Sequence, residues 1–126
     1  MTIAQQLKVK EFPFTIKDSK GNEIYYESSD GYWRKSEYDS NGNEIYYEIS
    51  NGFWRKSEYD SKGNLIYYKN SDGFWIKREY DSNGKEIYCE NSDGLLIDNR
   101  PKSEVQKAIE LLTKEGLIVD GKILKQ

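Results

Sequence analysis

The side chains that could do chemistry in this sequence are carboxylates, tyrosines and a single thiol, because the chain contains no histidine. Acids recur near tyrosines at a fixed spacing, as Glu23 and Glu44 do, and many glycosidases work with a pair of carboxylates. Recurrence of the same pair in successive units is more typical of a structural ladder. The lack of histidine removes His-based triads, most zinc sites and the commonest general base. We therefore expect no enzymatic activity and no catalytic residues.

Cys89 is the only cysteine, so no disulfide framework can form, and a reducing cytoplasm is compatible with the sequence. It occupies a tyrosine position of its row and has no basic neighbour placed by the sequence, which favours a packing thiol over a nucleophile. The repeated Asp-Ser-Asn-Gly lacks the acidic spacing of a calcium-binding EF-hand, and a β-turn explains it better. We predict neither a metal nor a cofactor.

Composition limits the classes of partner. Apolar residues make up 36% and aromatic residues 14% of the 126 residues, so any core must be built largely from amphipathic rings. A net charge of −3 gives no field that would attract nucleic acid or an anionic membrane. The start, MTIAQQLKVKE, has no apolar signal region, and no stretch approaches the roughly 20 apolar residues of a membrane helix. These features predict a soluble, unexported, cytoplasmic protein.

An internal repeat organises the chain. The glycines form two series, each at a 21-residue spacing: Gly21, Gly42, Gly63 and Gly84, and Gly31, Gly52, Gly73 and Gly94. Four units follow each other without insertion. A period of this length indicates a stacked array of small supersecondary units.

Two turn signals in each unit predict β-hairpins. Asp-Ser-Asn-Gly at 39–42 suits a type I turn whose glycine takes the left-handed position of a G1 bulge, whereas Asp30-Gly31 and Asn51-Gly52 suit two-residue type I′ turns. The stretches between the turns are rich in Tyr, Trp, Phe and Ile and contain no proline. The predicted fold class is mainly β, an antiparallel β-meander of four hairpin repeats with about nine strands over 12–97.

The assumed turns also predict the two faces of the sheet, because opposed residues lie on the same face. Glu27 would face Arg34, and Tyr25 would face Ser36. One predicted face carries Tyr25, Arg34, Tyr46, Arg55, Tyr67 and Tyr88. The other carries Ile24, Ile45, Ile66 and Ile87 with Trp33, Trp54 and Trp75. Neither face has the composition of a dry core, so we expect stability to come from many cross-strand pairs of ~0.2–1 kcal/mol each.

The chain divides into a lead segment at 1–11, the repeat sheet at 12–98 and a C-terminal helix with a short hairpin at 99–126. Ser103 and Gln106 form a capping-box pattern, and an apolar stripe continues until Gly116 ends the helix. Asp120-Gly121 predicts the hairpin turn. This tail is similar to the end of a winged-helix domain, but the net charge argues against DNA binding. We expect the helix to cover part of the face that carries the tryptophans.

The Tyr-Asp-x-x-Gly core of the units, at 38–42, 59–63 and 80–84, resembles the YD repeat of RHS-type proteins and of short bacterial and prophage proteins. The resemblance covers about residues 12–98. Large RHS proteins form a shell around a toxin, which four units are too few to enclose. MORN-like and choline-binding repeats have a similar length and aromatic content, but their motifs fit less well.

A binding function remains. A sheet that exposes rows of tyrosines and paired charges suits a protein partner, because Tyr, Trp and Arg dominate interface hot spots. We therefore predict a non-enzymatic protein-binding module, such as a phage-encoded or bacterial adaptor or inhibitor. The predicted contact residues are Tyr25, Arg34, Tyr46, Arg55, Tyr67 and Tyr88. Carbohydrate or cell-wall binding and self-association into a homo-oligomer are the alternatives.

Overall fold

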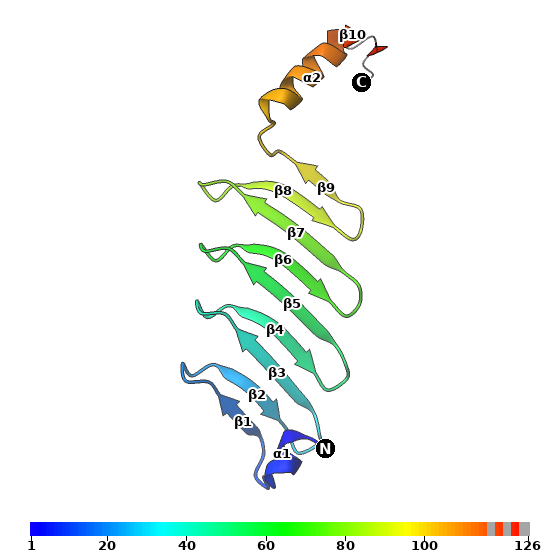
Figure 1. The fold of residues 1–126 in the computed structure, drawn as a ribbon. Coiled ribbons are helices and arrows are strands. Elements are labelled where there is room, and N and C mark those ends of the chain that lie inside the picture. The colour runs from blue at the N-terminus through cyan, green and yellow to red at the C-terminus, as the bar shows by residue number, and fades with distance from the viewer. Residues whose placement is uncertain (116–117, 120–121, 124–126) are drawn as a thin grey trace.

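A single antiparallel meander dominates the computed structural model, which describes residues 1–115, 118–119 and 122–123. Nine strands pair in chain order and stack along one direction from the N-terminal to the C-terminal end (Figure 1). They are β1 (Phe14–Lys17), β2 (Glu23–Glu27), β3 (Trp33–Tyr38), β4 (Glu44–Ile49), β5 (Trp54–Tyr59), β6 (Leu65–Asn70), β7 (Trp75–Tyr80), β8 (Glu86–Asn91) and β9 (Leu96–Asp98). The predicted meander of hairpin repeats is confirmed.

The lead segment contains a short helix, α1 (Ile3–Leu7), which the sequence analysis did not predict. A capping box begins it: the Gln5 backbone N–H donates to Thr2 Oγ1 at 3.2 Å, and the Thr2 N–H donates to Gln5 Oε1 at 2.9 Å. This Thr-x-x-Gln pattern was the available signal for the helix.

The C-terminal helix, α2 (Glu104–Glu115), begins where Ser103 caps it, and the Gln106 N–H donates to Ser103 Oγ at 3.1 Å. It extends beyond β9 and makes no extensive contact with the strands that the structure describes (Figure 1). The prediction that this helix covers the tryptophans is therefore wrong. β10 (Ile118–Val119) and β11 (Lys122–Ile123) pair as predicted, whereas Gly116 and the turn at 120–121 lie outside the described residues.

The two turns of each unit have the same geometry. At 39–43 the Asp39 N–H bonds the Asn43 carbonyl at 2.9 Å, and Gly42 has a φ of 86°, as predicted for a G1 bulge. At 28–32 the Ser28 N–H bonds the Tyr32 carbonyl at 2.9 Å, so this loop also has three residues. Gly31 has a φ of 91°, but Asp30 does not adopt a positive φ. The type I′ prediction is wrong, because that turn needs positive φ at both central residues.

The longer loop changes the register. Tyr25 pairs with Lys35 rather than with Ser36, and Glu27 pairs with Trp33 rather than with Arg34. A β-bulge also inserts an extra residue in β2, β4, β6 and β8, as Ile45 is inserted in β4. Because side chains alternate along a strand, a shift of one residue moves β3, β5 and β7 side chains to the opposite face. The predicted division of residues between the faces is therefore wrong.

The corrected register defines two faces. The tyrosine face carries Tyr25, Tyr46, Tyr67 and Tyr88 together with Trp33, Trp54, Trp75, Lys35, Lys56, Lys77, Glu37, Glu58, Glu79, Glu27, Glu48, Lys69 and Glu90. The arginine face carries Arg34, Arg55, Arg78, Tyr26, Tyr47, Tyr68, Ser36, Ser57, Glu23 and Glu44.

The sheet is a single layer without a dry core. Among the described residues, only Ala4, Tyr25, Cys89 and the carboxylate-bearing Glu27 are buried. The remaining residues of β1 to β9 are half-buried or exposed on both faces. Cross-strand pairs and turn hydrogen bonds therefore hold this sheet together, as the composition predicted.

Candidate protein-binding face

The tyrosine face repeats almost the same side chains from unit to unit. Each tyrosine follows the bulge of its strand and lies opposite a lysine of the next strand in the first three units, as Tyr46 lies opposite Lys56. Trp54 lies two residues before that lysine. The ammonium group of Lys56 lies over the Trp54 ring, with 5.2 Å between Nζ and the ring centre. The face is therefore a series of similar sites along the meander.

Three of the tyrosines donate a hydrogen bond to a glutamate two residues later on the same strand. The Tyr46 hydroxyl lies 2.6 Å from Glu48 Oε1, the Tyr25 hydroxyl lies 2.8 Å from Glu27 Oε1, and the Tyr88 hydroxyl donates to Glu90. The bond to Glu48 and partial burial raise the pKa of Tyr46 to about 12. Burial and Glu27 raise the pKa of Tyr25 to about 12 as well. These phenols are protonated donors at neutral pH.

The first unit differs because α1 lies on its tyrosine face. Thr2 Oγ1 donates to Glu27 Oε2 at 2.8 Å, and the Ala4 N–H donates to Glu27 Oε1 at 3.1 Å. Burial alone would raise the pKa of Glu27, but the bonds from Thr2, Tyr25 and Ala4 outweigh it and hold the pKa below its usual value. Glu27 is therefore an ionised carboxylate that is only 3% exposed.

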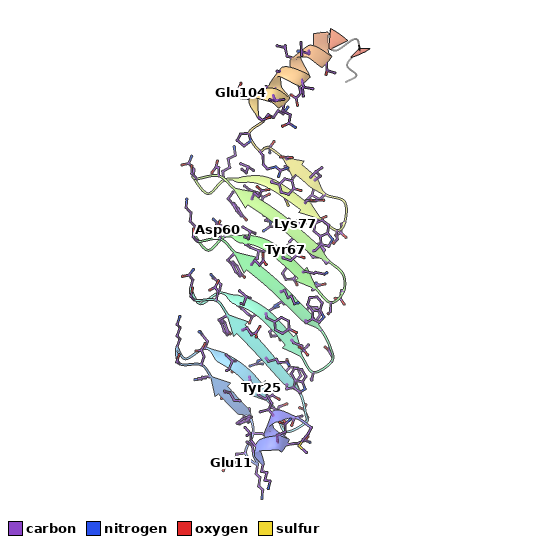
Figure 2. All side chains as sticks on the ribbon, viewed as in Figure 1. Glu11, Tyr25, Asp60, Tyr67, Lys77 and Glu104 are labelled. Carbon is purple, nitrogen blue, oxygen red and sulfur yellow. The ribbon has the colours of Figure 1, made fainter. Side chains whose placement is uncertain are left out.

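Shallow hollows lie between the tyrosine positions. One of about 640 Å³ is lined by residues that include Ile3, Tyr25, Lys35 and Ile45. The next, of about 280 Å³, lies between Tyr46 and Tyr67, and a third, of about 410 Å³, lies between Tyr67 and Tyr88. Figure 2 shows the Tyr67 and Lys77 side chains close together in the middle of the array. The face thus offers recesses lined by rings and both signs of charge.

The arginine face has its charges paired within the sheet. Arg34 Nη2 lies 3.0 Å from Glu23 Oε1, and the guanidinium carbon lies 4.0 Å from the centre of the Tyr26 ring. Arg55 repeats this arrangement with Glu44 at 2.9 Å and with Tyr47 at 4.2 Å. Arg34 and Arg55 therefore lie on the face opposite to Tyr25, Tyr46, Tyr67 and Tyr88, so the predicted contact set is split between two faces.

The thiol and the acidic side chains are the other groups that could do chemistry. Cys89 is a free cysteine that is 3% exposed, and it lies opposite Arg78, a basic neighbour that the sequence did not predict. Across the described residues, no three His, Cys, Asp or Glu side chains converge as a metal site requires. Neither described helix has the length and apolar character needed to cross a membrane.

The lysines and tryptophans of the tyrosine face were not among the predicted contact residues. Two-residue loops at the Asp-Gly and Asn-Gly turns would have placed them on the other face. The strand spacing also carries no clear signature of the bulge at Ile45.

No protein-family model matches the chain, and no curated protein matches it. The resemblance to YD-repeat proteins therefore stays a prediction.

Proposed function

We propose that this chain is a non-enzymatic protein-binding module that uses its tyrosine face to engage another protein as an adaptor or inhibitor. The observation that carries the proposal is the seating of α1 on the first unit. There a helical segment covers Tyr25 and supplies donors to Glu27. The second and third units present the same tyrosine, tryptophan and lysine without such a cover.

The contrast between the faces supports this choice of surface. On the arginine face, Arg34 and Arg55 already have acidic and aromatic partners. On the tyrosine face, Lys56 and Glu58 are exposed, and the tyrosine rings are half-buried beside open hollows. Half-buried rings with nearby charges are typical of interface hot spots. We therefore narrow the proposed contact residues to Tyr46 and Tyr67 with their lysine and tryptophan neighbours, because α1 already buries Tyr25 and Arg100 stacks on Tyr88.

Paired tyrosines on opposite faces allow a matched test. Tyr46 and Tyr67 lie on the tyrosine face, and their sequence neighbours Tyr47 and Tyr68 lie on the arginine face. The wild-type chain would first be used as bait in a lysate, and the captured protein would be identified and purified. Binding of that protein would then be measured for the Tyr46→Ser, Tyr67→Ser double variant and for the Tyr47→Ser, Tyr68→Ser double variant.

We expect the first double variant to bind at least about tenfold more weakly, which corresponds to about 1.4 kcal/mol. The second should bind normally at temperatures well below its melting point, although loss of the ring under Arg55 lowers its stability. Equal binding by both variants, or loss only in the second, would contradict the proposal. Retention of the wild type on a cell-wall polysaccharide, or on a second copy of itself, with no protein captured, would favour the alternative functions.

A further inference from the structure

Position 69 interrupts the regular pattern of the tyrosine face. The first, second and fourth units place a glutamate two residues after the tyrosine, as Glu27, Glu48 and Glu90. The third unit has Lys69 there instead. Three other positions of the face do not change in the first three units. They are the tryptophan (Trp33, Trp54 and Trp75), the lysine (Lys35, Lys56 and Lys77) and the glutamate two residues after that lysine (Glu37, Glu58 and Glu79). The substitution is therefore a specific difference within an otherwise constant surface.

This change removes an acceptor and places two like charges together. Lys69 lies directly opposite Lys56, where Glu48 lies opposite Lys35 at 3.8 Å in the preceding unit. Like charges opposite each other destabilise a sheet. Among the described residues, the Tyr67 hydroxyl has no hydrogen-bond acceptor and Lys69 has no ion-pair partner.

The surroundings of Tyr67 are basic on two sides. Lys77 lies opposite Tyr67 on β7, and Lys56 and Lys69 lie beside it. The acid nearest in register is Glu58, which lies opposite Tyr67 on β5. Glu58 forms no ion pair in the described part of the chain, and the hollow next to Tyr67 is open to solvent.

We propose that the third unit is a receptor for an acidic side chain of the protein partner, whose carboxylate takes the place that Glu27, Glu48 and Glu90 occupy in the other units. It would accept from the Tyr67 hydroxyl and pair with Lys56 and Lys69, as Glu48 accepts from Tyr46 and pairs with Lys35. This inference rests on the proposed function of the tyrosine face. It adds the chemistry of the contact and the place where the partner is held.

The first test needs no partner. Lys69→Glu supplies the missing carboxylate from within the chain, so it should raise the melting temperature by forming the Tyr67 hydrogen bond and the pair with Lys56. Lys10→Glu makes the same change in net charge on an exposed residue away from the strands, and it should not raise the melting temperature. A Lys69→Glu variant that melts at or below the wild-type temperature would overturn the inference.

The second test uses a phage-displayed library of random twelve-residue peptides, selected in parallel on the wild type and on Lys69→Glu. We expect peptides with an Asp or Glu at a fixed place to be enriched on the wild type only. The most enriched peptide would then be synthesised with its acid intact and with the acid changed to the amide. Removing the acid, or introducing Lys69→Glu, should each weaken binding about tenfold, and the two changes together should weaken it little further.

The outcomes separate this inference from the proposed function. Peptides that lack an acid and depend on Tyr46 and Tyr67, but bind Lys69→Glu normally, would overturn the inference and leave the proposed function standing. Peptides that bind regardless of the tyrosines, or no enrichment at all, would overturn both. Displacement of the peptide by inorganic phosphate at a similar concentration would show a general anion site, which also contradicts a carboxylate receptor.

Discussion

The two faces of this sheet are built from the same kinds of residue, but they differ in how far their charged side chains are paired. On the arginine face, Arg34 and Arg55 are each paired with an acid and stacked on a tyrosine. On the tyrosine face, Glu58 is exposed and unpaired within the described chain, and Glu27 is buried where α1 covers it. The arginine face therefore stabilises the array, and the tyrosine face is the one that we propose for contact with a partner. Glutamate-to-glutamine variants can test this division, because they remove charge with little change in shape.

The largest effect is expected at the covered site. Glu27→Gln replaces a buried carboxylate that accepts from Thr2, Ala4 and Tyr25. An amide offers only one oxygen to these donors, so we expect the free energy of unfolding to fall by ~1–3 kcal/mol. Chemical denaturation of the variant would measure it, and faster amide exchange in α1 would locate the loss. An unchanged stability would show that α1 does not depend on this contact.

A smaller effect should distinguish the two faces in the middle of the sheet. Glu44→Gln breaks the charged bond to Arg55 on the arginine face and should cost ~0.5–1 kcal/mol, the size of a partly exposed ion pair. Glu58→Gln on the tyrosine face should change stability by less than ~0.5 kcal/mol. Denaturation curves of the two variants side by side would settle the comparison. Equal losses would mean that both faces are structural.

Low pH should remove the contribution of ionised Glu27 to the stability of the fold. The folded-state pKa of Glu27 is lowered, so its stabilisation is present above its unfolded value of about 4.5 and is lost as the pH falls through the folded-state pKa. The difference in melting temperature between the wild type and Glu27→Gln should therefore narrow when melts are repeated at pH values below about 4. A difference that stays constant into strong acid would assign the stabilisation to packing rather than to the ionised carboxylate.

The sequence predicts the strands of the sheet and α2 well because their signals are local. Glycine spacing marks every turn, aromatic and β-branched runs mark the strands, and Ser103 marks the start of α2. The faces were predicted wrongly, because Asp30-Gly31 is compatible with loops of two or three residues and the bulge at Ile45 shifts the register again. The tyrosines of the site were identified, but the lysines beside them depended on that register. The apolar stripe of α2 does not specify which surface it contacts, so the sequence could not show that this helix leaves the sheet uncovered.

The pairing of each strand with its immediate neighbours in the sequence has a consequence for how the chain folds. Every strand pair in the described nine-stranded sheet is closed by a short turn, so no pairing has to wait for a long loop to close. Chains with such local contacts fold fast, and arrays of similar units can nucleate at any unit and grow outward. The same property lets the array open from its ends. A partner that spans several units would join segments that otherwise open one after another, and its binding would appear as greater cooperativity of unfolding.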